Sequence, residues 1–263
     1  MRFMDLADEY SGENSFFSIL PIEYEKDVTY GKGASKGPKE IIKASQHLEY
    51  YDEQFYCEPF LKGIKTLEAV EEVKELSNNF TIALGGDHSI TIGVVDKLLE
   101  KEDFSVIVLD AHSDMRHSWN NSKYNHACTS KRISEKTSIG LIGIRSQDID
   151  EAKEIKKNKD IHQIKAYEFN EEKLFQLLKK LKNKVYISID VDVFDPSFIR
   201  NTGTPEPGGF TWNEVINILQ KIFKEKEVIG ADIVEFAPNI NFEAEAYSLA
   251  KLAYKLMSLK LSL

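Results

Sequence analysis

The sequence has few cysteines and no long hydrophobic run. Cys57 and Cys128 are its only cysteines among 263 residues. That is too few for a disulfide scaffold, so a reducing compartment is the default. The N-terminus has one early arginine and no long apolar stretch, so it predicts no secretory signal. The longest apolar runs, such as residues 106–109, are strand-sized and fall far short of the roughly 20 residues of a membrane span. We therefore expect a cytoplasmic protein with no membrane partner.

The chain also lacks an excess of basic residues. It has 34 Lys and Arg against 43 Asp and Glu, which gives a formal net charge of −9. Nucleic-acid binding needs clustered Lys and Arg, so this balance argues against a nucleic-acid partner and would suit a cationic one. Apolar residues make up 42% and charged residues 29%, which excludes collagen-like, disordered and coiled-coil classes.

Internal repeats, low-complexity tracts and linkers are not visible either, and the length suits one α/β domain over residues 1–263. The apolar runs that predict strands lack strict alternation, which is typical of a parallel sheet buried on both faces. They lie at residues 16–22, 80–84, 104–109, 138–144, 162–166, 185–189 and 228–234. Helical patterns separate them at residues 39–51, 67–77, 89–101, 170–182, 211–224 and 244–261. This alternation predicts βαβ units and a sheet covered by helices on both sides.

Four of the predicted strands run directly into His or carboxylate residues. Residues 80–84 precede Gly-Gly-Asp-His-Ser at 85–89, and residues 104–109 precede Asp-Ala-His-Ser-Asp at 110–114. Residues 185–189 precede Asp-Val-Asp at 190–192, and residues 228–234 precede Glu235. Ligands bind at the carboxyl edge of open α/β sheets, so these side chains predict a site there.

Each of these residues alone has an ordinary explanation, but the group does not. His88 could be a loop histidine, and Asp110 or Asp190 a helix cap or turn former. Residues at i, i+2 and i+4 of an extended chain share a face, however, so the residues at 110, 112 and 114 can converge. Several buried carboxylates need a compensating positive charge, which a metal would supply. The candidate ligands are His88, Asp110, His112, Asp114, Asp190 and Asp192.

Six protein ligands are too many for one open metal site and fit two ions bridged by shared carboxylates. Oxygen-rich ligation without thiolates favours Mn²⁺ over Zn²⁺, with Fe, Co and Ni left open. Two ions about 3.5–4 Å apart make hydroxide from a bridging water near neutral pH. Four aspartates, two divalent ions and one hydroxide leave a charge of −1, which a monocationic substrate would balance. The residues thus predict metal-assisted hydrolysis of a small cation, without saying which bond is cut.

The three metal-ligand motifs, in this order, resemble those of the ureohydrolase family, which includes arginases and agmatinases. The third continues through Asp195-Pro196 to the Thr-Gly-Thr-Pro-Glu-Pro-Gly-Gly run at 202–209, and the resemblance covers about residues 28–238. It implies an arginase-like three-layer α/β/α sandwich with a mainly parallel sheet and two Mn²⁺ per chain. By position, His88 and Asp114 would hold one ion, His112 and Asp192 the other, and Asp110 and Asp190 would bridge both.

The resemblance also implies roles for two further residues. His126 matches a proton-shuttling histidine, and Glu235 matches the glutamate that binds the substrate guanidinium, a cation whose planar fork of donors suits a carboxylate. Asp114 would carry a proton from the attacking hydroxide to the leaving nitrogen. Hydrolysis of the guanidinium would release urea and an amine.

Within the family, the loop at 115–125 lacks the arginase pattern, and Lys-Tyr-Asn-His at 123–126 resembles agmatinases. We therefore expect hydrolysis of agmatine to putrescine and urea, a step of polyamine biosynthesis. Arg116, and Arg200 in a segment that departs from the family, could bind a substrate carboxylate, which leaves arginine and guanidinobutyrate as alternatives. A metal-binding partner protein without turnover is the alternative from another class. The resemblance further predicts a homo-oligomer, a trimer or a hexamer.

Overall fold

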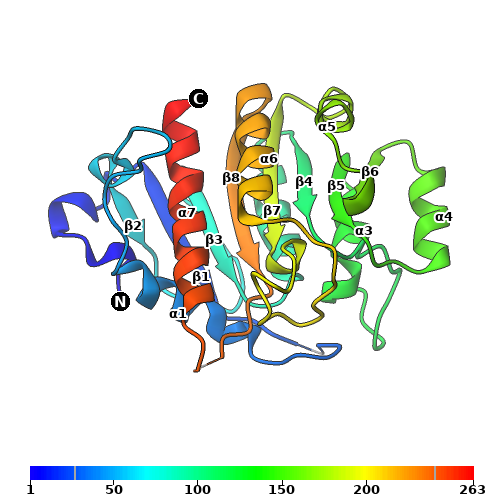
Figure 1. Ribbon diagram of the computed structural model, residues 1–263, viewed down its shortest axis with the longest axis horizontal. Coiled ribbons are helices and arrows are strands. Elements are labelled where there is room, and N and C mark those ends of the chain that lie inside the picture. Colours follow the sequence, from blue (N-terminus) through cyan, green and yellow to red (C-terminus); the bar gives the residue numbers. More distant parts are fainter. Residues whose placement is uncertain (27, 240) are drawn as a thin grey trace.

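A computed structural model describes residues 1–26, 28–239 and 241–263. An eight-stranded sheet forms its centre, and all neighbouring strands are parallel (Figure 1). The strand order is β2-β1-β3-β8-β7-β4-β5-β6. The strands are β1 (Phe17–Ile22), β2 (Ile64–Thr66), β3 (Phe80–Gly85), β4 (Ser105–Leu109), β5 (Ile139–Ile144), β6 (Ile161–Lys165), β7 (Lys184–Asp190) and β8 (Glu227–Val234).

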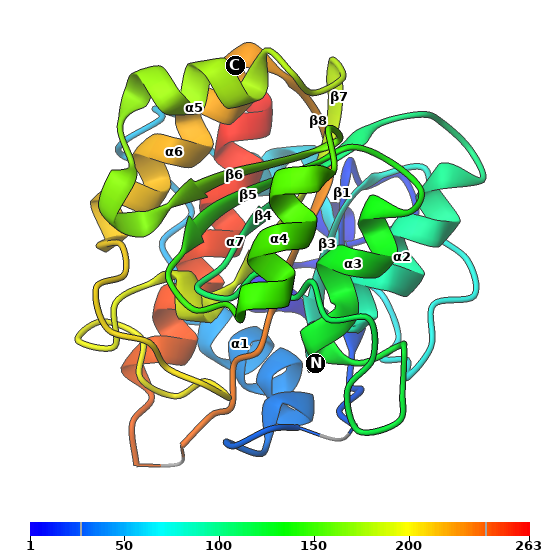
Figure 2. The ribbon, with the colours of Figure 1, turned by 90° about the vertical axis from the view of Figure 1, so that its right-hand side faces the viewer.

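Helices cover both faces of the sheet (Figure 2). Each face has its own apolar core. One core is formed with α1 (Gly37–Ser45), α5 (Glu171–Leu178), α6 (Trp212–Glu225) and α7 (Ala244–Ser262). The other is formed with α2 (Ile90–Leu99), α3 (Thr129–Ser134) and α4 (Ile149–Lys157). The apolar strands are buried from both sides, as their lack of alternation predicts. The predicted three-layer α/β/α sandwich is confirmed.

All seven predicted strands form, and each observed end lies within one residue of the prediction. Strand β2 and helices α3 and α4 were not predicted, because the first two are short and α4 has few apolar residues. The start of α4 nevertheless carries a local signal. Asp148 and Glu151 form a capping box at its N-terminus, the reciprocal arrangement of side chains that favours helix initiation.

The predicted helix over residues 67–77 is wrong, because this segment is not helical. Its backbone instead continues along β1: Leu67 N–H donates to the Ile19 carbonyl at 2.9 Å, and Val70 N–H donates to the Pro21 carbonyl at 3.0 Å. The buried Val73 and Leu76 then pack in one of the cores. The apolar residues that are three positions apart here lie in an extended segment at the sheet, because hydrogen bonding to β1 outweighs helix formation. The predicted helix at 39–51 also ends early, at Ser45.

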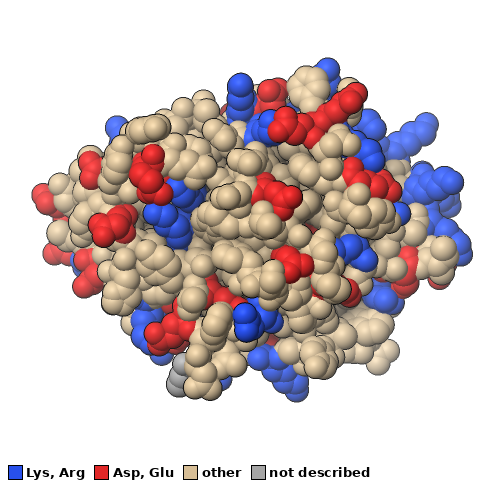
Figure 3. Space-filling view, in the orientation of Figure 1, with Lys and Arg blue, Asp and Glu red and all other residues tan. Residues whose placement is uncertain are grey.

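The surface carries charges of both signs on the face over α6 and α7, where basic and acidic side chains are interspersed (Figure 3). Such a mixture gives this face little attraction for a phosphate backbone. Across the three described ranges, we find no helix that is both long and apolar enough to cross a membrane.

Candidate metal centre

Four neighbouring strands deliver the polar residues to one edge of the sheet. The order β3-β8-β7-β4 makes adjacent the four strands whose ends the sequence singles out. Two groups of side chains there could hold a metal ion, and within each group the ligand atoms lie within 4.8 Å of one another. One group is His88, Asp110 and Asp114, and the other is Asp110, His112 and Asp192. Asp110 belongs to both groups, as expected of a bridging ligand. Asp190, the other expected bridge, belongs to neither group, although its Oδ2 lies 3.3 Å from Nδ1 of His88.

The two glycines before His88 allow its loop to pass close to other parts of the chain. A Cβ on Gly86 would lie 1.8 Å from the carbonyl oxygen of Tyr24, and one on Gly85 would lie 2.7 Å from the side chain of Val234. A larger residue at either position would displace the loop. The Gly-Gly pair is therefore needed to hold His88 over the sheet edge.

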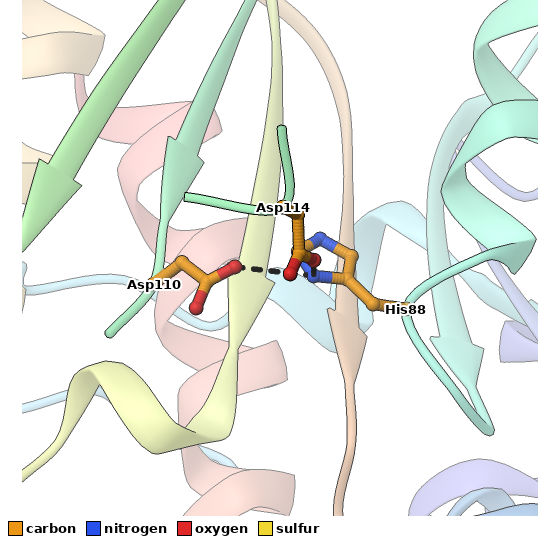
Figure 4. A group of neighbouring side chains, drawn as sticks. All are labelled: His88, Asp110 and Asp114. Carbon is orange, nitrogen blue, oxygen red and sulfur yellow. Dashed lines mark ion pairs between the residues drawn. The ribbon is translucent and has the colours of Figure 1, made fainter. Parts of the chain in front are cut away.

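His88 is almost fully buried, with 1% of its side chain exposed. Its Nδ1 lies 3.2 Å from Oδ2 of Asp110 and 3.0 Å from Oδ2 of Asp114 (Figure 4). The same atom lies 3.3 Å from Oδ2 of Asp190. Among the residues that the structure describes, neither His88 Nδ1 nor Asp110 Oδ2 has a hydrogen-bond partner. Burial opposes a charge on the ring, yet the carboxylates raise the pKa of His88 well above its usual value. A ring nitrogen surrounded by carboxylate oxygens is a place for a cation.

His112 lies closer to the surface, with 23% of its side chain exposed. Its Nδ1 is 2.8 Å from Oδ2 of Asp192, and its backbone N–H donates to Oδ1 of Asp110 at 2.6 Å. Its Nε2 points to Glu206, 3.8 Å away. Burial would lower the pKa of His112, but the carboxylates of Asp192 and Asp110 raise it to about 12.

The aspartates are crowded enough to retain protons. Burial and the charge of Asp110 raise the pKa of Asp114 to about 7. Burial and the charges of Asp192 and Asp110 raise the pKa of Asp190 well above its usual range. These carboxylates cannot all ionise together unless a cation separates them. The donor set is rich in oxygen and contains no thiolate, so it fits divalent ions of the Mg, Mn or Fe type, with the imidazoles favouring transition metals.

Two of the site's carboxylates stand on strained backbone. Asp114 has φ of 50° and Glu235 has φ of 67°, a conformation that costs a non-glycine residue about 1–3 kcal/mol. The Glu235 N–H donates to the Gly86 carbonyl at 2.8 Å, so the loop of His88 holds the strained residue in place. Strain of this kind persists where it directs a functional side chain.

The cluster opens into a cavity of about 390 Å³. Glu235 lines it, and its Oε1 accepts the backbone N–H of His88 at 2.7 Å. Burial and the charge of Asp87 raise the pKa of Glu235 well above its usual range. His126 lines the same cavity, with Nε2 2.8 Å from Oγ1 of Thr29. The structure thus brings the six candidate ligands, His126 and Glu235 to one place, with His88 and Asp110 behind the cavity wall.

Arg145 is a residue that the sequence pattern did not reveal. Its guanidinium donates to the backbone carbonyls of Asp192 at 2.7 Å, Glu206 at 2.8 Å and Pro207 at 3.1 Å. It therefore joins the loop after β7, which carries Asp192, to the loop at 203–209, which forms part of the cavity wall. The sequence suggests no more than a turn at Asp195. In the structure its carboxylate accepts the N–H of Gly208 at 2.9 Å and so stabilises the C-terminal end of that loop. An arginine bound to carbonyls has no sequence signature, because its partners are backbone atoms.

The two arginines left open by the sequence lie in different places. Arg116 lines the cavity, but its guanidinium pairs with Asp148 at 2.8 Å and stacks 4.6 Å from the ring centre of Trp119. Arg200 lies outside this cavity and faces a separate groove, where it stacks on Phe242. Arg200 is therefore not placed to meet a substrate here, and Arg116 already has an anionic partner.

Comparisons with known proteins agree with this architecture. A sequence profile of the arginase family matches residues 16–258. The N(1)-aminopropylagmatine ureohydrolase of Synechocystis sp. is 36% identical over 91% of this chain and 87% of its own length. The agmatinase of Pyrococcus horikoshii is 33% identical over 90% of this chain and 89% of its own. The crystal structure of agmatine ureohydrolase of Thermoplasma volcanium superposes with a TM-score of 0.84 at 26% identity, covering 100% of this chain and 96% of that one.

The family profile spans nearly the whole chain, and the relatives are matched over most of their length. The predicted resemblance to the ureohydrolases is confirmed, and so is the hydrolase class. This chain belongs to the arginase family of hydrolases.

Proposed function

We propose that this protein hydrolyses the guanidinium group of agmatine, releasing putrescine and urea. The single observation that carries the proposal is the convergence of four strand ends on one cavity, where two metal-ligand groups share Asp110 and Glu235 lies on the wall. Relatives named agmatinase and N(1)-aminopropylagmatine ureohydrolase support an agmatine-type substrate.

The ligands in this proposal are those expected from the sequence, with two Mn²⁺ per chain. His88 and Asp114 would hold one ion, His112 and Asp192 the other, and Asp110 and Asp190 both. Nδ1 of His88 and Oδ2 of Asp110 are buried 3.2 Å apart and have no hydrogen-bond partner among the described residues, which supports a shared metal ion. Two such ions supply a water nucleophile near neutral pH when bound.

The remaining roles belong to residues on the cavity wall. Glu235 would hold the guanidinium, since a buried carboxylate gains most from a cation that offers a planar fork of N–H donors. The His88 N–H fixes Oε1 of Glu235, which sets the direction of the carboxylate before substrate arrives. Asp114 would carry the proton to the leaving nitrogen, and His126, beside Thr29, would exchange protons with solvent.

The pairing of Arg116 favours agmatine over arginine. A substrate carboxylate would need a free cation near the distal end of the cavity, and Arg116 is the arginine that lines it. Its ion pair with Asp148 and its stacking on Trp119 would have to be broken first. Agmatine has no carboxylate and requires no such rearrangement.

A longer substrate, N(1)-aminopropylagmatine, is the second candidate. Four of the curated relatives carry that name in their own titles. The cavity wall also carries Glu206, whose side chain is 35% exposed and has no ion-pair partner among the described residues except His112 at 3.8 Å. A carboxylate there would suit the additional ammonium of the longer chain.

The test is urea release by the Mn²⁺-loaded protein with four guanidines at equal concentration: agmatine, N(1)-aminopropylagmatine, arginine and guanidinobutyrate. We expect the two carboxylate-free substrates to be cleaved and the two carboxylates to be poor substrates. Preference for arginine or guanidinobutyrate would refute the substrate proposal and would mean that Arg116 leaves Asp148. No urea from any of them would refute the guanidine hydrolase itself.

We propose in addition that the protein acts in the cytoplasm, in polyamine biosynthesis, as a homo-oligomer with three or six copies of a chain that forms one domain. The molar mass in solution, measured by light scattering against the 30.1 kDa chain, tests the assembly. A monomer would contradict it.

A further inference from the structure

A chain of buried hydrogen bonds leads from His88 away from the metal centre. His88 Nε2 lies 3.0 Å from Oγ of Ser188, and that hydroxyl donates to Oδ1 of Asp232 at 2.6 Å. Ser188 lies on β7 and Asp232 on the neighbouring β8. All three side chains are inaccessible to solvent or nearly so, so the chain belongs to the core rather than to the cavity.

Asp232 is the end point of this chain because it collects hydroxyl donors. Besides Ser188, it accepts the hydroxyl of Thr91 at 2.9 Å and that of Tyr186 at 3.0 Å, both at Oδ2. Burial favours the neutral carboxyl, but three hydroxyl protons point at its two oxygens, which stabilises the ionised form, and an ionised carboxylate only accepts hydrogen bonds. Asp232 therefore takes the single hydroxyl proton of Ser188 and leaves that oxygen as an acceptor.

The polarity of the chain fixes the protonation of the His88 ring. Since the Ser188 oxygen must accept, Nε2 of His88 must donate and therefore carries a proton. In a neutral imidazole the lone pair then resides on Nδ1, which is the atom that faces Asp110, Asp114 and Asp190. Partners behind a ligating histidine set its tautomer and orientation in this way.

We propose that Asp232 is a positioning residue that, through Ser188, presents Nδ1 of His88 as a metal ligand. This inference rests on the metal centre proposed above. Asp232 touches neither the cavity nor the other ligand groups, and its effect passes through one hydroxyl. It acts on the His88 half of the centre only.

The test compares three variants by titration of the metal-free protein with Mn²⁺. Ser188→Ala removes the middle of the chain. Asp232→Asn can offer an amide N–H to Ser188, which would reverse the hydrogen bond to His88. The matched control is Tyr186→Phe, which removes one donor to Asp232 but leaves the chain to His88 complete.

We expect Ser188→Ala and Asp232→Asn to weaken one of the two Mn²⁺ binding steps by about 10- to 100-fold and to leave the other step unchanged. Tyr186→Phe should keep both steps within about threefold of the unmodified protein. Asp232→Asn is the variant more prone to misfold. If it does not fold, Ser188→Ala, which changes the core less, is sufficient for the test.

A second measurement separates positioning from loss of packing. In protein labelled with ¹⁵N-histidine and loaded with diamagnetic Zn²⁺, the Nε2 proton of His88 should give a slowly exchanging signal, and Ser188→Thr, which keeps the hydroxyl, should preserve it. Ser188→Ala should abolish the slow exchange.

Two unchanged Mn²⁺ steps in both Ser188→Ala and Asp232→Asn would overturn the inference while leaving the metal centre intact. An equal loss in Tyr186→Phe would overturn it too, by assigning the effect to packing. An unmodified protein that binds no Mn²⁺ would instead refute the metal centre, and this inference with it.

Discussion

The two histidines of the centre are supported in opposite ways. Behind His88 lie Ser188 and Asp232, fully buried residues on two central strands. Behind His112 lies Glu206, a partly exposed residue of the loop at 203–209, at 3.8 Å. One histidine of the centre is thus held within the core, and the other faces the cavity and is held from the surface.

This difference shows how one sheet edge can combine rigidity with access. Side chains that a core fixes lose little freedom when they bind a ligand, which favours precise placement. The half that faces the cavity is where substrate and solvent must enter. Asp110 connects the two, because it belongs to both ligand groups.

The largest loss of metal and activity should come from removing Asp110, which connects the two ligand groups. Asp110→Ala takes one ligand from each group, so we expect both ions to be lost and urea release to fall by about 10⁴-fold, since metal catalysis supplies several kcal/mol. Metal content by mass spectrometry and urea assay check this. Asp150→Ala, at an exposed position on α4, is the control and should change neither. Retention of two ions by Asp110→Ala would remove its bridging role.

Removing one histidine at a time should separate the halves. We expect His88→Ala and His112→Ala each to keep one ion per chain and to lose about 10³-fold in activity. Unfolding of the metal-free proteins should differ, because only His88→Ala leaves a cavity and an unsatisfied Ser188 in the core, at a cost of about 2 kcal/mol. Chemical denaturation measures this difference. Equal free energies of unfolding for the two metal-free variants would contradict the difference between a histidine in the core and one at the surface.

The crowded aspartates predict the pH dependence of the metal-free protein. Burial and the charge of Asp110 raise the pKa of Asp114 to about 7, above its value in the unfolded chain, near 3.9. The folded state therefore binds this proton more tightly, and the stability it contributes is complete below pH 4 and lost as the pH rises to 7. Calorimetry should show a falling melting temperature over this range, and Asp114→Asn should flatten the fall. A melting temperature that rises with pH would contradict the crowding.

His126 belongs to neither half, since it lies on the cavity wall beside Thr29. We expect His126→Ala to lower kcat by about 10²-fold, the usual contribution of a group that transfers protons, and to leave two ions bound. Addition of imidazole should restore part of the rate. Loss of metal from this variant would make His126 a ligand and would enlarge the centre.

Glu206 should have the smallest effect. Its contact with His112 is long and partly exposed, and such a contact contributes little. We expect Glu206→Gln to change kcat for agmatine by about twofold at most, while the metal content stays the same. A tenfold loss would mean that the surface side of the centre is held as firmly as the core side.

The sequence predicted the strands, and it indicated candidate ligands at the strand ends, because both depend on local patterns. Apolar runs without alternation marked each buried strand, and the residue after each strand end fell at the same sheet edge. Adjacency of the four strands follows from the strand order, which the apolar runs alone do not determine. The wrong helix at 67–77 shows the limit, since pairing with β1 is a tertiary effect that overrode the spacing of Val70 and Val73.

The supporting residues could not be predicted in the same way. Arg145 binds backbone carbonyls, and Asp232 binds hydroxyls from β7 and α2. Neither set of partners is close in the sequence or restricted to one residue type. Asp232 precedes Glu235 by three residues in an apolar strand, and a buried charge in such a strand is the one signal that could have indicated a partner.

The most direct test of a centre with two halves joined by Asp110 is the electron paramagnetic resonance spectrum of the protein titrated with Mn²⁺. We predict saturation at two ions per chain and a spectrum of two exchange-coupled Mn²⁺, because carboxylate-bridged ions lie about 4 Å apart. Saturation at one ion, or two ions that give only the six-line signal of isolated Mn²⁺, would contradict the shared ligand and the joined halves.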